Sequence, residues 1–128
     1  DVIIDLTNRL KPLITEFVQS FPLLIKMCNS RDFQNKLSGW GVVLSKAGYQ
    51  KRHIHPEAIV SGVVYIKLSD ECIDQSLSGG NLLLHSYQND VMITPNEGLV
   101  VLFPSYLAHE TIPLSYDHER ICIAFNYF

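Results

Sequence analysis

Two histidines stand one residue apart at positions 53 and 55, directly before an apolar, β-branched run. In an extended segment, side chains at i and i+2 leave the same face, so the imidazoles of His53 and His55 would point to one side. Imidazole nitrogens are the commonest metal ligands in proteins. His109 and Arg120, near the C-terminus, offer a third ligand and a partner for an anion. This spacing predicts a metal site built from two distant segments.

Two ligand sets are compatible with this pattern. Non-haem iron oxygenases bind iron on one side with two histidines and a carboxylate, and leave the other side open for oxygen and co-substrate. The segment His53-Ile-His-Pro-Glu permits the pair His53 and His55, which gives three histidines with His109. It also permits the pair His55 and Glu57, which keeps the carboxylate. An isolated His-x-His is typical of surface histidines, so the interpretation depends on the C-terminal residues.

Arg120 opens the last predicted strand, eleven positions after His109. A guanidinium inside a β-barrel is costly unless a carboxylate meets it. The five-carbon dicarboxylate 2-oxoglutarate would supply that carboxylate, and the fork of Arg120 would hold it by two parallel hydrogen bonds. The residues therefore favour Fe(II) and 2-oxoglutarate as the cofactors.

Other polar and aromatic residues give weaker signals. His85 and His118 have no ligand partner at suitable spacing, so we interpret them as solvated or locally bonded. Trp40 begins a strand and is interpreted as a core residue or a hydrophobic staple, in preference to a platform for substrate. Ser105 belongs to a Pro-Ser-Tyr turn. Asn126 lies on the same strand face as the arginine, where it either reaches the site or satisfies a turn.

The elements that must position these residues are short strands. From residue 40 onward, β-branched and aromatic runs alternate with turn residues, which is typical of an antiparallel sheet protein. The predicted strands are 41–44, 59–68, 81–85, 91–94, 99–103 and 120–127. Glycines in several of the turns permit positive φ. Many short strands at this spacing favour a sandwich or jelly roll, and the longest predicted loop is 69–79.

The N-terminal part has a different period. Residues 2–28 carry apolar side chains at three- and four-residue steps, which predicts an amphipathic helix. Pro22 is expected to end or kink it, with a short helical piece following over 23–27. Such a stripe usually packs on the outside of a sheet.

Composition limits the classes of partner. A chain of 128 residues with 47% hydrophobic residues predicts one domain, 1–128, with 1–37 as helical support and 38–128 as the β core. A net charge of -3 provides no basic face, so nucleic acid is not expected as a partner. No apolar run is long enough to span a bilayer, so no membrane partner is expected. The three cysteines form no Cys-x-x-Cys pair, which indicates a reducing, cytoplasmic location.

Six motifs, in order, resemble those of a known enzyme family. They are Gly39-Trp-Gly-Val-Val-Leu, His53-Ile-His-Pro, Ser61-Gly-Val-Val-Tyr, Gly79-Gly-Asn-Leu, Glu97-Gly-Leu-Val-Val-Leu-Phe-Pro-Ser-Tyr-Leu-Ala-His and Glu119-Arg-Ile-Cys-Ile-Ala-Phe-Asn. From about residue 38 onward, the chain resembles the 2-oxoglutarate- and iron(II)-dependent oxygenases of bacteria and phages, distant relatives of the prolyl hydroxylases. The resemblance implies a mainly β fold, a double-stranded β-helix (jelly roll) with the N-terminal helix packed on the sheet.

The resemblance also implies roles for site residues. In the family both histidines before the proline recur, while the residue at position 57 varies. The resemblance therefore favours His53, His55 and His109 as the metal ligands. Tyr65 matches the position from which related hydroxylases donate a phenol hydrogen bond to the distal carboxylate of 2-oxoglutarate, beside Arg120. The other interpretation of Tyr65 is a core aromatic. Cys122 stands where the family usually has a serine, which removes a hydrogen-bond donor.

The activity implied is that of a dioxygenase that hydroxylates an unactivated C–H bond, with 2-oxoglutarate and O2 as co-substrates. The substrate is a protein side chain or a metabolite, since nothing in the sequence distinguishes them. An alternative is a non-catalytic, cupin-like module that binds a metal or a small ligand. A cupin-type dioxygenase that needs no 2-oxoglutarate is a third hypothesis, and Arg120 argues against it. A homodimer through the apolar helix or a barrel edge is compatible with the pattern.

Overall fold

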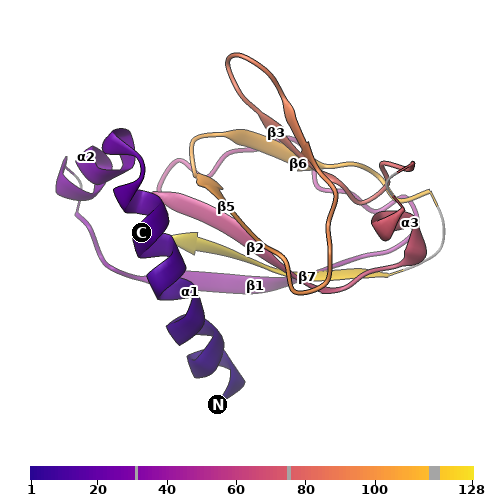
Figure 1. Ribbon diagram of the computed structural model, residues 1–128, viewed down its shortest axis with the longest axis horizontal. Helices are drawn as coiled ribbons and strands as arrows, with labels where there is room; N and C mark the ends of the chain where they lie inside the picture. The colour runs from indigo at the N-terminus through magenta and orange to yellow at the C-terminus, as the bar shows by residue number, and fades with distance from the viewer. Residues whose placement is uncertain (31, 75, 116–118) are drawn as a thin grey trace.

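Two antiparallel sheets and three helices make up this protein, for which a computed structural model describes residues 1–30, 32–74, 76–115 and 119–128. The helices are α1 (Val2–Gln19), α2 (Pro22–Ser30) and α3 (Asp70–Ile73). The strands are β1 (Leu37–Leu44), β2 (Val60–Lys67), β3 (Leu82–His85), β4 (Val91–Ile93), β5 (Val100–Pro104), β6 (Ala108–Thr111) and β7 (Arg120–Tyr127). The larger sheet has the strand order β1-β7-β2-β5 and the smaller one β4-β3-β6. Figure 1 shows the small sheet above the large one, with α1 and α2 together at one end.

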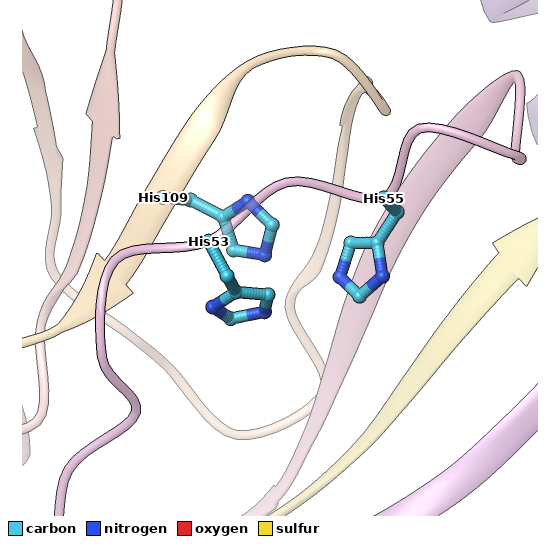
Figure 2. Close-up of side chains that lie close together, drawn as sticks. All are labelled: His53, His55 and His109. Atoms are coloured by element: carbon cyan, nitrogen blue, oxygen red, sulfur yellow. The ribbon is translucent and has the colours of Figure 1, made fainter.

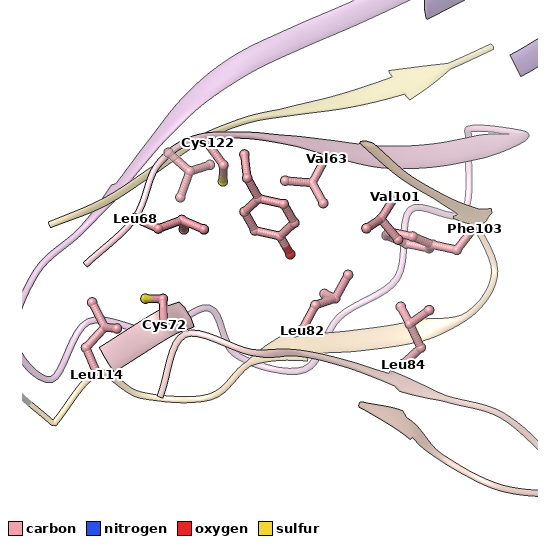
Figure 3. Close-up of a cluster of buried hydrophobic side chains, with 11 residues drawn as sticks. Val63, Leu68, Cys72, Leu82, Leu84, Val101, Phe103, Leu114 and Cys122 are labelled. Carbon is pink, nitrogen blue, oxygen red and sulfur yellow. The ribbon is translucent and has the colours of Figure 1, made fainter. Parts of the chain in front are cut away.

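Side chains between the two sheets form an inner core. Successive strand residues face opposite sides, so alternate residues of β2, β5 and β7 point toward the small sheet. The buried side chains labelled in Figure 3 are Val63, Leu68, Cys72, Leu82, Leu84, Val101, Phe103, Leu114 and Cys122. The same alternation turns Ser61 and Arg120 inward, where they line a cavity between the sheets.

An outer core joins the helices to the other face of the large sheet. Leu10, Ile14 and Val18 of α1 follow the helical repeat and pack with Val64 and Phe125. This packing explains why the first six residues of β2 are all buried, although antiparallel strands often leave one face to solvent. The predicted helix on the outside of the sheet is confirmed. As predicted, the first helix ends before Pro22, which is the first residue of α2.

Two elements were not predicted. Residues 108–111 form β6, a strand of its own that carries His109, whereas the sequence suggested only the end of the preceding apolar strand. Only one of the four residues of β6 is clearly apolar, so the alternation of apolar and polar residues that indicates a strand is too short to detect. The loop predicted over 69–79 contains the single helical turn α3. Glu71 of that turn is buried and accepts a hydrogen bond from the backbone amide of Ser115, a tertiary contact that no local pattern reveals.

Strand ends mostly lie within two residues of the predicted ones, except that β1 begins at Leu37 and not at residue 41. Its pairing with β7 holds the glycine-containing segment extended despite low strand propensity. Positive φ occurs at Gly80 and Gly98, as predicted for glycine turns. In the turn at 46–48 the positive φ falls on Ala47 and not on the glycine.

Gly62 of β2 tests how closely the outer core is packed. A Cβ atom at this position would lie 2.3 Å from Phe125 Cζ and 2.8 Å from the carbonyl oxygen of Val101. We expect Gly62→Ala to lower the free energy of unfolding by about 1–3 kcal/mol, since overpacking forces neighbours to shift. Urea denaturation measures it. Gly41→Ala is the matched control, because a Cβ there meets nothing within 4 Å; equal stability losses in both variants would contradict the packing argument.

Candidate metal centre

The backbones of His53 and His109 are paired directly. The amide nitrogen of each donates to the carbonyl oxygen of the other at 3.0 Å, which forms an isolated antiparallel bridge. Residues paired in this way project their side chains to the same face. Their ring centroids lie 4.2 Å apart. A single bridge therefore positions His53, and the continuous strand that the spacing suggested is absent at 53–57.

His55 completes the group from the loop before β2. Its backbone amide donates to the carbonyl oxygen of Ser105 at 3.0 Å, and its carbonyl accepts from the amide of Ala58 at 3.2 Å. One nitrogen from each of the three histidines lies within 4.8 Å of the others, and Figure 2 shows the three rings gathered together. In the part of the chain that the structure describes, no other group of three His, Cys, Asp or Glu side chains is so arranged. The donor chemistry fits a divalent transition metal.

Two of the rings have their outer nitrogen fixed by the backbone. His53 Nδ1 donates to the carbonyl oxygen of Lys51 at 2.6 Å, and His109 Nδ1 donates to that of Leu107 at 3.0 Å. A carbonyl oxygen only accepts, so the proton must sit on Nδ1 in both rings. Nε2 of each is left with a free lone pair for a metal, as is usual for metal-binding histidines.

The surroundings keep the rings of His55 and His109 neutral. Burial is the main cause that lowers the pKa of His109 from 6.5 to about 4; the neighbouring histidines contribute to the decrease, and the hydrogen bond to Leu107 partly opposes it. Burial, and then the charge of His53, also lowers the pKa of His55. Metal ligation requires a neutral imidazole. Both rings are therefore available to a metal at neutral pH.

The lowered pKa of His109 makes stability depend on pH. Between pH 6.5 and about 4 the unfolded chain binds a proton at this ring that the folded chain does not bind. The free energy of unfolding should therefore fall as pH drops through this window, by about 2 kcal/mol at pH 5 from this group. Urea denaturation at pH 7 and pH 5, with a chelator present, measures the loss. His109→Gln should show a smaller loss than the wild type; equal losses would contradict the assignment.

Other predicted residues lie outside the histidine cluster. Glu57, the alternative ligand, is exposed on the turn after His55 and is not part of the cluster. His85 lies 3.0 Å from Asp90 and 3.6 Å from Glu110, so its interpretation as a locally bonded residue is confirmed. His118 is outside the described residues.

Trp40 was wrongly interpreted as a core residue. Its side chain is 40% exposed, its ring centroid lies 6.0 Å from that of His55, and it lines the cavity that holds the histidines. Strand propensity could not reveal this, because exposure depends on which elements cover the sheet edge. Ser105 does belong to a turn, as predicted, and its hydroxyl donates to the carbonyl oxygen of Ala58.

Arg120 and Tyr65 form a second polar group in the interior. The Arg120 side chain is 1% exposed, with Nε donating to the carbonyl oxygen of Gly80 at 3.0 Å and Nη1 donating to Cys122 Sγ at 3.4 Å. No carboxylate of a described residue forms an ion pair with it. Its guanidinium carbon lies 5.0 Å from the centroid of the Tyr65 ring. A buried charge in this state favours an anionic ligand.

The hydroxyl of Tyr65 is also without a hydrogen-bond partner among the described residues, although the residue is fully buried. Burial raises the pKa of the phenol, and the charge of Arg120 only partly opposes the rise. The group is therefore a neutral donor at physiological pH. A guanidinium without an ion pair and a phenol without an acceptor fit a carboxylate that accepts from both.

One cavity connects the histidines to the arginine. Its lining includes all three histidines, Arg120 and Trp40, and side chains that the sequence interpretation did not single out, namely Gln50, Ser61 and Thr111. Ser61 lies four residues before Tyr65 on β2 and therefore on the same strand face. This spacing in the sequence could have identified Ser61 as a cavity residue. The free volume is about 30 Å³, which holds about one water molecule. A molecule as large as 2-oxoglutarate would enter only if lining side chains moved apart.

Comparison with known proteins gives one family and one fold. A sequence model of the family described as "Putative 2OG-Fe(II) oxygenase" matches residues 38–126. No curated protein sequence is similar enough to count as a match. A prolyl-4-hydroxylase from Pseudomonas putida has a similar structure, with a TM-score of 0.60, 19% identity, and coverage of 74% of this chain and 52% of that one.

Two further solved structures are similar. A prolyl hydroxylase from Trichoplax adhaerens, in complex with a hypoxia inducible factor peptide fragment, has a TM-score of 0.59 and 23% identity and covers 90% of this chain and 54% of its own. A cupin domain from Bordetella pertussis has a TM-score of 0.50 and 17% identity, with coverage of 76% and 88%. These likenesses confirm the predicted jelly roll. The chain spans about half the length of the prolyl hydroxylases that it matches. No helix in the described ranges has the length and apolar character needed to cross a bilayer.

Proposed function

This chain belongs to the 2OG-Fe(II) oxygenase family, and we propose that it is a dioxygenase that hydroxylates an unactivated C–H bond. In this proposal Fe(II) is bound by His53, His55 and His109. The co-substrate 2-oxoglutarate is bound by Arg120 and Tyr65.

The observation that carries the proposal is the buried pair of Arg120 and Tyr65. Arg120 lines the same cavity as the three histidines, and the Tyr65 hydroxyl has no hydrogen-bond partner among the described residues. A guanidinium that is 1% exposed, and that has no ion pair with any described residue, is expensive to bury unless an anion binds it. The partnerless phenol of Tyr65 adds a neutral donor 5.0 Å from the same group, measured from ring centroid to guanidinium carbon. A dicarboxylate that reaches from the metal to Arg120 would satisfy both donors.

When bound, Fe(II) and 2-oxoglutarate supply the oxidising power for hydroxylation by O2, with 2-oxoglutarate converted to succinate and CO2. The chain's own part is binding and orientation. The three imidazoles hold the metal on one side and leave positions open on the other. Arg120 fixes the far carboxylate, and the apolar side chains of the inner core exclude water from the bound co-substrate.

The partners proposed are 2-oxoglutarate, O2 and a substrate that is either a protein side chain or a metabolite. Figure 2 shows the three rings that would meet a metal, and the partly exposed ring of Trp40 lies beside one of them, where a substrate would approach. We also propose that residues 1–128 act as one domain and that the protein works in the cytoplasm. The free thiols of Cys28, Cys72 and Cys122 agree with a reducing compartment.

Anaerobic titration of the metal-free chain with Fe(II), followed by 2-oxoglutarate, tests the proposal. We expect a visible charge-transfer band that forms only when both are present. Addition of O2 should then produce succinate. Iron binding without a band on addition of 2-oxoglutarate would contradict the co-substrate assignment, and absence of iron binding would contradict the metal site.

The second candidate is a metal-binding module without turnover. The cavity volume of about 30 Å³ favours it, because so small a cavity admits a metal ion more readily than a dicarboxylate. Cys122, which stands in place of the serine usual in the family, is a weaker hydrogen-bond donor than a hydroxyl. The same titration separates the two candidates, since the module would bind the metal with no effect of 2-oxoglutarate.

A further inference from the structure

His55 differs from the other two histidines in what holds its outer nitrogen. His53 and His109 each donate from Nδ1 to a backbone carbonyl. Nδ1 of His55 instead lies 3.2 Å from Nδ2 of Asn126, the nitrogen of a side-chain amide. An amide nitrogen only donates, so Nδ1 of His55 must accept in this arrangement. The proton of the neutral ring is then on Nε2.

A buried hydroxyl contacts the other end of the same amide. Ser61 Oγ donates to Asn126 Oδ1 at 2.8 Å, and the amide nitrogen faces His55. Ser61 and Asn126 are directly opposite each other on β2 and β7, and their exposures are 2% and 8%. The two strands therefore hold the amide beside the ring.

This direction of hydrogen bonding is incompatible with metal ligation by His55. With Nδ1 facing Asn126, the remaining nitrogen, Nε2, is the ligand atom, and it must give up its proton to bind a metal. The proton of the neutral ring then has to sit on Nδ1, which becomes a donor. Two donors would face each other unless the amide turns.

On the basis of the proposed metal site, we infer that Asn126 is a positioning residue whose side-chain amide turns over when the metal binds. The turn places Oδ1 at Nδ1 of His55 and Nδ2 at Oγ of Ser61. Serine suits both states, because a hydroxyl both donates and accepts. The chain of hydrogen bonds through Ser61, Asn126 and His55 thus reverses its direction, while only the amide oxygen and nitrogen of Asn126 exchange places.

Nitrogen-15 NMR of the full chain tests the reversal, with Zn(II) as a diamagnetic probe of the site. We expect His55 to carry its proton on Nε2 in the metal-free protein and on Nδ1 in the Zn(II)-bound protein. His53 and His109 should carry it on Nδ1 in both states. A proton on Nδ1 of His55 in both states would overturn the reversal.

Zn(II) affinity, measured by competition with a chelator, tests the positioning role. Asn126→Leu should weaken binding by about 10- to 100-fold, the range typical of outer-shell partners of metal ligands. Asn126→Asp should restore it, because a carboxylate always accepts from Nδ1. Asn81→Leu is the matched control, since Asn81 is also buried but its amide nitrogen contacts Thr94 and no histidine.

The outcomes separate this inference from the proposed function. If the wild type binds no Zn(II), the metal site itself is contradicted. If the wild type and Asn126→Leu bind Zn(II) equally well, only the role of Asn126 is overturned. Should Asn126→Leu fail to fold, Asn126→Ala replaces it. That variant also removes the amide, and we expect the same weakening of Zn(II) binding, by about 10- to 100-fold; wild-type affinity in that variant would overturn the inference.

Discussion

His109→Ala is expected to abolish tight metal binding. The substitution removes one of three nitrogen donors that lie within 4.8 Å of one another, and it removes the ligand whose neutral form is best secured, since burial lowers its pKa to about 4. The loss in Fe(II) or Zn(II) affinity should exceed the roughly 10- to 100-fold expected for outer-shell substitutions. Isothermal titration calorimetry under anaerobic conditions measures it.

His85→Ala serves as the matched control for that experiment. His85 is on β3, next to the strand that carries His109, but its ring is paired with Asp90 and Glu110 outside the cluster. Metal affinity should be unchanged in this variant. Retention of metal affinity in His109→Ala, or an equal loss in the control, would show that the three histidines are not the metal site.

Arg120→Ala is expected to remove 2-oxoglutarate binding while leaving metal binding in place. The guanidinium is 1% exposed, so its contact with a carboxylate would be shielded from water. Truncation of one partner of such a buried charge pair costs about 2–5 kcal/mol, so affinity for 2-oxoglutarate should fall by roughly 30-fold or more. Competition binding in the presence of saturating Fe(II), without oxygen, measures the change.

Two variants make this result specific. Arg120→Lys keeps the charge but loses the planar fork, so 2-oxoglutarate affinity should be intermediate. Lys67→Ala removes a cation at the neighbouring end of β2 whose exposed side chain pairs with Glu119, and it should have no effect. Equal losses of iron and 2-oxoglutarate affinity in Arg120→Ala would indicate unfolding and contradict a specific anion site.

Much of this fold could be predicted because its signals are local. The alternation along β7 places Arg120, Cys122 and Asn126 on one strand face, and hydrogen bonds of these side chains confirm that face. The helical period of the N-terminal segment correctly indicated a helix packed on a sheet. Glycines at 80 and 98 adopt positive φ as the turn chemistry required.

The remaining features depend on contacts between distant segments. The bridge between His53 and His109 is made by backbone atoms, so no side-chain pattern indicates it. The exposure of Trp40 depends on how much of the edge strand β1 the rest of the fold covers, and β6 exists because β3 pairs with it. The Ser61 and Asn126 pair depends on the register between β2 and β7, which hydrophobic alternation alone does not determine.

The bridge at the histidines also has a consequence for the unfolded chain. A metal ion that joins His53 to His109 closes the loop that runs from residue 53 to residue 109, in the manner of a reversible cross-link. Such a cross-link removes conformational entropy from the unfolded state, and the effect grows slowly with loop length. Without the metal, two backbone hydrogen bonds join these residues. The metal would therefore stabilise the folded chain as a reversible cross-link, and its loss would lower the barrier to unfolding in the region of the proposed metal site.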